Sequence, residues 1–214
     1  MKPDILFVLD ILGIVSFTVS GVLVAIEKKM DLMGVFILGA VASMGGGVMR
    51  DILIGSTPPA IFVNPHYIGV SFITSLVVFL VFYFHMEVKS KPQLHRFLEK
   101  LFFWFDTIGL ASFTANGVIT GKLAGQGAFL CCFLGVITGV GGGILRDLLA
   151  TRIPVIFVKH IYAAASIAGA VVITLMWNFN SLFAVTVGLI LIVLIRVLAR
   201  TFKWNLPKVP TDVV

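Results

Sequence analysis

The feature that most constrains this chain is an internal repeat. Residues 10–55 recur at 106–151 without a gap, and 15 of the 46 aligned positions are identical. After one extra residue in the first copy, the match continues at an offset of 95, where Tyr67 aligns with Tyr162. Agreement of this extent is not expected by chance. The fold must therefore be built from two copies of one unit.

Both copies consist of apolar runs that are long enough to cross a membrane as helices. A run of about 20 residues spans about 30 Å of hydrocarbon, whereas barrel strands would show period-two alternation over about 10 residues. With 59% hydrophobic and only 12% charged residues, the chain cannot cover a soluble core. The predicted spans are 5–26, 32–55, 60–84, 102–121, 125–149, 155–177 and 180–200. The predicted class is an all-α polytopic membrane protein.

The repeat unit contains three of these spans, and three is an odd number. Successive copies of such a unit enter the membrane from opposite sides, as in the inverted repeats of transport proteins. We therefore predict two inverted three-helix repeats and a seventh helix that has no counterpart. The predicted segments are 1–85 and 102–178 for the repeats, 86–101 for a cytoplasmic amphipathic linker, 179–201 for the seventh helix and 202–214 for a cytoplasmic tail.

Basic residues indicate the orientation of the chain. The side that holds the first, third and fifth loops and the C-terminus carries twelve: Lys28, Lys29, Lys89, Lys91, Arg96, Lys100, Arg152, Lys159, Arg196, Arg200, Lys203 and Lys208. The other side carries only Lys2 and Lys122, and Arg50 and Arg146 are left out of this count because they belong to a motif discussed below. The positive-inside rule then places the C-terminus in the cytoplasm and the N-terminus outside a bacterial inner membrane. Because the charges lie at the ends of apolar runs, the net charge of +6 does not indicate nucleic-acid binding.

A glycine triplet recurs in the second and fifth spans. The two triplets are Gly45, Gly46 and Gly47, and Gly141, Gly142 and Gly143. Each glycine costs a helix about 1 kcal/mol relative to alanine, and about 20 Å of helix before each triplet places it near the bilayer centre. One reading is a helix that bends or opens there and offers carbonyls to a cation. The other is a close helix crossing.

An Arg-Asp pair follows each triplet by three residues, as Arg50-Asp51 and Arg146-Asp147. Ionisable side chains inside spans are rare and usually mark a pathway. In an inverted repeat one pair lies toward each face of the membrane, which suits two vestibules around a constriction. The alternative readings are a structural ion pair and an arginine that snorkels to the lipid headgroups.

Polar side chains also recur on the first and fourth spans. They are Ser16, Thr18 and Ser20 in the first copy and Ser112, Thr114 and Asn116 in the second. This polar stripe is expected either to line a pore or to form hydrogen bonds between helices. Asp10 and Asp106 occupy equivalent early positions, and we interpret both as helix N-terminal caps.

Other classes of site have little support in the sequence. No P-loop, GxSxG, HExxH or CxxC motif occurs, and the adjacent Cys131 and Cys132 lack metal-ligand spacing. We therefore predict no enzymatic activity, no cofactor, no metal site and no nucleic-acid partner. The expected partners are potassium or sodium ions and membrane lipids.

The doubled GGGxxRD motif resembles a known family. It is present as GGGVMRD and GGGILRD, each preceded by an SFT-containing helix and followed by a PxIF element. Over about residues 4–200 the chain is similar to the prokaryotic branch of the trimeric intracellular cation channels (TRIC), whose repeat is also known as a glycine-transporter-like domain. The resemblance implies a homotrimer with a potassium-permeable pore in each protomer, bent at the glycine triplets. The two Arg-Asp pairs would be its charged pathway groups.

Three functions are compatible with these residues. The first is a passive monovalent cation channel with one pore per protomer, and the second is a secondary carrier for glycine or another small amino acid. The third is a membrane scaffold that transports nothing. The scaffold predicts that alanine at Gly46 or Gly142 changes stability only, whereas the carrier predicts saturable uptake.

Overall fold

The computed structural model describes residues 3–85, 91–158 and 161–204, and all regular structure within these residues is helical. Its helices are α1 (Pro3–Glu27), α2 (Leu32–Leu53), α3 (Ala60–Val63), α4 (Pro65–His85), α5 (Lys91–Leu123), α6 (Ala128–Leu149), α7 (Val155–Val158), α8 (Tyr162–Met176) and α9 (Ser181–Thr201). Each long helix corresponds to one predicted span. The prediction of an all-α fold is confirmed.

Within the described residues, five helices are long and apolar enough to cross a membrane. They cover Ile5–Glu27, Leu32–Leu53, Pro65–Phe84, Ala128–Leu149 and Ser181–Thr201. Large apolar side chains are exposed on the surface, including Phe84 at 70%, Phe129 at 85% and Phe179 at 89%. Such a surface is stable in contact with lipid rather than with water. The chain is an integral membrane protein.

The predicted boundaries differ from the structure at the linker and at the third and sixth spans. The linker predicted at 86–101 is not a separate element from Lys91 onward, because α5 runs unbroken from Lys91 to Leu123. Pro92 lies in the first turn of that helix, where a missing N–H costs nothing. The predicted runs 60–84 and 155–177 each begin with a separate one-turn helix, α3 or α7, before the long helix. Residues 86–90 of the linker and 205–214 of the tail lie outside the described residues.

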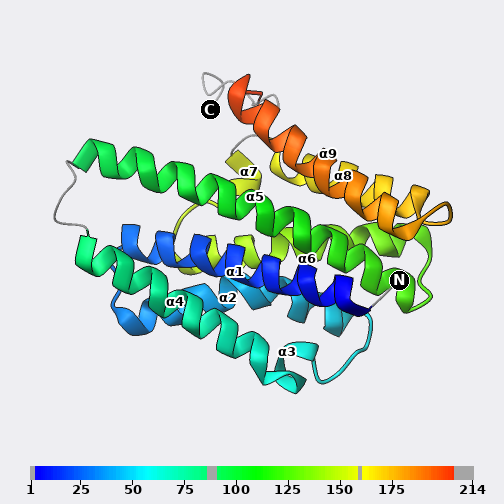
Figure 1. The fold of residues 1–214 in the computed structure, drawn as a ribbon, viewed down its shortest axis with the longest axis horizontal. Helices are drawn as coiled ribbons and strands as arrows, with labels where there is room; N and C mark the ends of the chain where they lie inside the picture. The colour runs from blue at the N-terminus through cyan, green and yellow to red at the C-terminus, as the bar shows by residue number, and fades with distance from the viewer. Residues whose placement is uncertain (1–2, 86–90, 159–160, 205–214) are drawn as a thin grey trace, which may run out of the picture.

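The long helices run side by side, with α1 and α5 at the centre of the bundle (Figure 1). These two helices are equivalent in the repeat, and they run in opposite directions. Helix α2 contacts both α1 and α6, α4 covers α1 and α2, and α8 and α9 pack together against α5. Each repeat therefore contributes its first two helices to the centre of the molecule.

The contact between α1 and α5 is reciprocal. Phe17 and Phe113, which are equivalent, meet edge to face with ring centroids 5.4 Å apart. The Phe113 ring lies against Gly13, where an added β-carbon would be 2.5 Å from it, and the Phe17 ring lies against the equivalent Gly109. Both glycines make room for a ring of the other copy. The centre of the bundle thus has the pattern of a two-fold contact.

Candidate functional site

The glycine triplets form the crossing of α2 and α6. A β-carbon at Gly46 would overlap the carbonyl oxygen of Thr138, and a β-carbon at Gly142 would overlap that of Ala42. Ala42 and Thr138 are themselves equivalent, so this contact is reciprocal too. Only glycine permits two helix backbones to approach this closely. The crossing interpretation of the triplets is confirmed.

Both helices continue through their triplets. Residues 32–53 and 128–149 are helical throughout, so the backbone does not open at the glycines in this structure. The expectation of unwound segments with free carbonyls is therefore wrong here, because the partner helix packs directly on the glycines. The third glycine of each triplet has more space. A β-carbon at Gly47 would have one neighbour within 4 Å, the Arg50 side chain at 3.9 Å.

Arg50 at the end of α2 organises the first polar cluster, which we call the Arg50 cluster. Its guanidinium donates to Asp51 Oδ1 at 2.8 Å and to Oδ1 of Asn116 on α5. Asn116 in turn donates to Asp10 Oδ1 at 2.8 Å, and the Tyr67 hydroxyl donates to Asp10 Oδ2 at 3.1 Å. The cluster thus connects α1, α2, α4 and α5, with Asp51 bonded directly to the guanidinium and Asp10 linked to it through Asn116.

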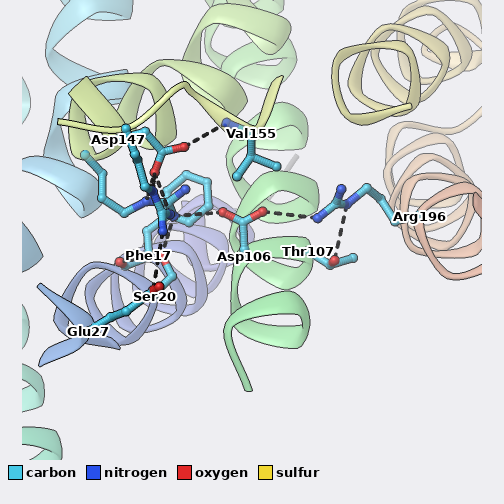
Figure 2. Close-up of polar contacts among 10 residues, drawn as sticks. Phe17, Ser20, Glu27, Asp106, Thr107, Asp147, Val155 and Arg196 are labelled. Atoms are coloured by element: carbon cyan, nitrogen blue, oxygen red, sulfur yellow. Dashed lines mark hydrogen bonds and ion pairs between the residues drawn. The ribbon is translucent and has the colours of Figure 1, made fainter. Parts of the chain in front are cut away.

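Arg146 at the end of α6 organises the equivalent cluster, which we call the Arg146 cluster (Figure 2). Its guanidinium donates at 2.8 Å to each of Asp147, Ser20 and Asp106. Ser20 is equivalent to Asn116, and Asp106 is equivalent to Asp10. Arg146 is 1% exposed, so three oxygen acceptors replace the water that this charge has lost.

Two further arginines complete the Arg146 cluster. Arg196 of α9 donates to Asp106 Oδ2 at 3.2 Å and to the Thr107 hydroxyl at 3.3 Å, so that Asp106 lies between two guanidinium groups (Figure 2). Arg152 donates to Asp147 Oδ1 at 2.7 Å and lies 3.7 Å from Glu27 Oε2. Three guanidinium groups therefore face two buried carboxylates, with Glu27 at the periphery.

The short helices α3 and α7 explain why an aspartate follows each arginine. Asp51 Oδ2 accepts the backbone N–H of Ala60, and Asp147 Oδ2 accepts that of Val155, each at 2.9 Å. These residues are the first of α3 and α7, where N–H groups have no partner within the helix. Each aspartate thus binds the preceding arginine with one carboxylate oxygen. Its other oxygen binds the first N–H of the short helix that follows.

The N-cap interpretation of Asp10 and Asp106 is wrong. Asp10 lies two turns into α1, and Asp106 lies in the middle of α5, because that helix already begins at Lys91. Both carboxylates belong to the polar clusters instead. The interpretation of Arg196 as a topology signal is also wrong, because this residue is 2% exposed and bonded to Asp106. Its position inside the apolar run LILIVLIRVLAR was the signal of a buried ionic group.

The hydroxyl stripe divides between two roles. Thr18 bonds Ser71 at 3.0 Å, and the equivalent Thr114 bonds Ser166 at 2.8 Å, both between buried side chains of neighbouring helices. Ser16 and Ser112 are buried as well, at 4% and 3% exposure. Ser20 and Asn116 reach the arginines of the other repeat. In this structure Thr18 and Thr114 join helices.

Replacing Thr114 by alanine should therefore have a small effect. Hydrogen bonds between membrane helices are worth about 0.6 kcal/mol on average, so we expect a loss of that order in the free energy of unfolding. Denaturant titration in micelles, with Thr114→Ala, Ser166→Ala and the double variant, measures the coupling of the pair. A strongly non-additive loss of about 2 kcal/mol or more would contradict this modest role.

The two clusters differ in the space beside them. A cavity of about 40 Å³ adjoins the Arg50 cluster and is lined by side chains that include Asp10, Ser43, Met44 and Tyr67. A cavity of about 10 to 15 Å³ already holds one water molecule. The equivalent void at the Arg146 cluster, lined by Val140, Tyr162 and others, has about 0 Å³ available to water. The void beside Tyr162 is thus closed where the one beside Tyr67 is open, although a second cavity of about 100 Å³ adjoins the Arg146 cluster at Arg152 and Val155.

The clusters lie at separate depths along the helix axes. Asp10 of α1 belongs to the Arg50 cluster and Ser20 of the same helix belongs to the Arg146 cluster. Ten residues of α-helix span about 15 Å, so the clusters are at least that far apart along α1. The glycine crossing precedes each arginine by about one turn on α2 and on α6. The crossing therefore lies between the two clusters in depth.

The sequence has clear relatives among bacterial membrane proteins. A family model described as "Glycine transporter" matches twice, at residues 7–83 and 103–178. The chain is 36% identical over 203 residues to the UPF0126 membrane protein YvgT of Bacillus subtilis, covering 94% of each chain. It is also 36% identical over 206 residues to the UPF0126 inner membrane protein YadS of Escherichia coli K12, covering 95% of this chain and 94% of that one.

Solved structures share the fold over almost the whole chain. A prokaryotic TRIC channel in 0.5 M KCl superimposes with a TM-score of 0.85 at 30% identity, covering 96% of this chain and all of that one. The TRIC trimeric intracellular cation channel orthologue from Rhodobacter sphaeroides gives 0.82 at 31% identity, over 93% and 98%. Both sequence and fold therefore agree with the resemblance found in the doubled motif. The chain belongs to the trimeric intracellular cation channel (TRIC) family, whose repeat is the one described as a glycine transporter.

Proposed function

We propose that this protein is a potassium-permeable cation channel with one pathway inside each protomer. The observation that carries the proposal is the glycine crossing of α2 and α6, flanked along the bundle by two buried Arg-Asp clusters. The pathway runs from the cavity beside the Arg50 cluster, past the glycine triplets, to the Arg146 cluster. Its groups are Gly45, Gly46, Gly47, Arg50, Asp51, Gly141, Gly142, Gly143, Arg146, Asp147, Ser16, Thr18, Ser112 and Thr114.

The proposed architecture is seven membrane spans, with α1, α2 and α4 inverted relative to α5, α6 and α8, and α9 as the seventh. The reciprocal contacts of Phe17 with Gly109 and of Gly46 with Thr138 support a two-fold axis between the copies. The opposite directions of α1 and α5 support inversion. Inverted repeats place equivalent groups around one site near the bilayer midplane.

The Arg50 cluster suits a cation. Two carboxyl groups, Asp10 and Asp51, face one guanidinium beside a cavity that has room for water. Carboxylates near a pore attract cations and repel anions. The crossing then acts as the constriction, since no ion passes between two backbones in contact. This structure corresponds to a closed channel, and opening requires α2 and α6 to separate or bend at the triplets.

The proposed setting follows the relatives and the charge pattern. We place the protein in the bacterial inner membrane with the N-terminus outside and the C-terminus in the cytoplasm. The Arg50 cluster then lies in the outer half and the Arg146 cluster in the inner half. The assembly is a homotrimer, as in the similar trimeric channel from Rhodobacter sphaeroides. Its partners are potassium or sodium ions and membrane lipids.

Single-channel recording of the purified protein in planar bilayers tests the proposal. We expect discrete potassium currents whose reversal potential follows the potassium gradient. Chloride should not contribute to these currents. Asp51→Asn, which removes a carboxylate beside the outer cavity, should lower the cation-to-anion permeability ratio. Thr201→Ser at the exposed end of α9 is the matched control. The absence of any potassium conductance in protein that remains folded would refute the channel.

A second candidate is a carrier for glycine or another small amino acid. One observation favours it: of the two equivalent voids, the one beside Tyr67 has about 40 Å³ available to water and the one beside Tyr162 has about 0 Å³, an asymmetry that suits alternating access. A carrier predicts saturable uptake of labelled glycine into proteoliposomes without single-channel currents. A channel predicts single-channel currents and no accumulation of glycine inside the liposomes against its gradient.

A further inference from the structure

The repeat makes one difference between the clusters visible. Tyr67 and Tyr162 are equivalent, as are Asp10 and Asp106. In the Arg50 cluster the Tyr67 hydroxyl donates to Asp10 at 3.1 Å. Among the described residues, the buried Tyr162 hydroxyl has no hydrogen-bond partner. A buried hydroxyl without a partner costs free energy, so this tyrosine is held away from the acceptor that its counterpart uses.

Arg196 of α9 occupies the place of that missing bond. Its guanidinium donates to Asp106 Oδ2 at 3.2 Å, and its central carbon lies 4.5 Å from the centroid of the Tyr162 ring. The side chain therefore lies between the tyrosine ring and the carboxylate. Because α9 has no counterpart in the repeat, nothing equivalent stands between Tyr67 and Asp10.

The difference in how the two aspartates are bonded coincides with a difference in the space beside the two tyrosines. Where the tyrosine bonds the aspartate there is a cavity of about 40 Å³, and Tyr67 lines it. Beside the aspartate that Arg196 bonds, the equivalent void lined by Tyr162 has no room for water. The cavity of about 100 Å³ at Arg152 and Val155 is a separate one and is not lined by Tyr162. At the two equivalent aspartates, Tyr67 thus bonds Oδ2 of Asp10 and Arg196 bonds Oδ2 of Asp106.

We propose that Arg196 is a positioning residue, a latch that keeps the void between Tyr162 and Val140 closed in the inner half of the pathway. When Arg196 leaves Asp106, the Tyr162 hydroxyl takes the carboxylate, and this void acquires the bonding and the room for water found beside Tyr67. The placement of this cluster on the cytoplasmic side rests on the proposed function, whereas the action of Arg196 on Asp106 and Tyr162 does not. The seventh helix is therefore the element that makes two similar halves behave differently.

Two equivalent positions serve as reporters of the two halves. Met44 lines the cavity beside the Arg50 cluster, and Val140, 96 residues later, lines the closed void and is 3% exposed. Met44→Cys and Val140→Cys are introduced separately into a background with Cys131 and Cys132 replaced by alanine. Silver ion, a monovalent cation that reacts with thiols, is applied to the protein in micelles. After denaturation, a fluorescent maleimide counts the thiols that remain.

In the otherwise unchanged protein, the thiol at 44 should react at least tenfold faster than the thiol at 140. Arg196→Gln should raise the rate at 140 at least tenfold and leave the rate at 44 within twofold. Arg196→Lys keeps a positive charge and should restore most of the protection. Arg200→Gln is the matched control, because Arg200 lies one turn further along α9 and stacks on Phe103 at 4.2 Å.

Tyr162→Phe separates a latch from simple loosening of the fold. Alone it should leave the rate at 140 unchanged, since the hydroxyl it removes makes no bond in the closed form. Combined with Arg196→Gln, it should cancel most of the gain, because the released form needs the bond from Tyr162 to Asp106. Loosening would instead make the double variant react at least as fast as Arg196→Gln alone.

The latch is overturned if Arg196→Gln leaves position 140 protected, if Arg200→Gln exposes it equally, or if Tyr162→Phe does not reduce the gain. Potassium flux is measured in parallel. A gain in thiol reactivity without flux in any variant supports the latch and refutes the channel. A gain in both supports both.

Discussion

Replacing Asp106 by asparagine should destabilise the protein by about 3 to 5 kcal/mol, the usual cost of removing one partner from a buried ionic group. Asp106 is fully buried and bonds both Arg146 and Arg196, which are themselves 1% and 2% exposed. Asparagine keeps the shape of the side chain but removes the charge. The free energy of unfolding, followed by circular dichroism during denaturant titration in micelles, measures the loss.

Asp10→Asn is the matched control for this prediction. Asp10 is equivalent to Asp106, but its oxygens accept from the neutral donors Tyr67 and Asn116. We expect less than half the loss. Adding Arg196→Met to Asp106→Asn should recover part of the stability, since an apolar side chain needs no counter-charge. Equal losses for the two asparagine variants would show that the arginines do not depend on Asp106.

Replacing Gly46 by alanine should cost about 1 to 3 kcal/mol and impair transport, although alanine is the better helix former. The added methyl group would overlap the backbone carbonyl of Thr138, and a backbone cannot rotate away as a side chain can. Helices α2 and α6 must therefore move apart. Thermal unfolding of the purified variant and potassium flux per folded protein in liposomes are the two measurements.

Gly47→Ala provides the comparison within the same triplet. A β-carbon there would have one neighbour within 4 Å, the flexible Arg50 side chain. This variant should be neutral or up to about 1 kcal/mol more stable, from helix propensity alone. If both alanine variants are equally stable, the crossing is not tight. If Gly46→Ala lowers stability but leaves flux unchanged, the scaffold or another pathway is favoured.

Much of the fold follows from the chain itself. The start of α2 at Leu32 and the end of α6 at Leu149 coincide with the predicted limits, because apolar runs and polar breaks determine where membrane helices begin and end. The repeat also identifies which positions are equivalent. Gly46 and Gly142 could therefore be recognised as one structural feature before the structure was seen.

The partners of the polar residues could not be predicted in the same way. Periodicity places side chains on a helix face, but the pairing of Arg50 with Asn116, or of Arg146 with Ser20, depends on how far α1 and α5 slide past each other. That displacement is set by the fit of Phe17 and Phe113 against opposing glycines. The burial of Arg196 was missed for a simpler reason. The residue lies close to the end of its span, where a charge usually lies at the membrane interface.

The reciprocal crossing also has a consequence for a single repeat unit. Gly46 faces the backbone of residue 138, and Gly142 faces that of residue 42, so each copy supplies both halves of a self-complementary contact. Such a surface is self-complementary, so that any second copy of the unit related by a two-fold axis can form the same contact. With the proposed inversion, one three-helix unit present in both orientations would therefore form the same contact as a dimer of separate chains.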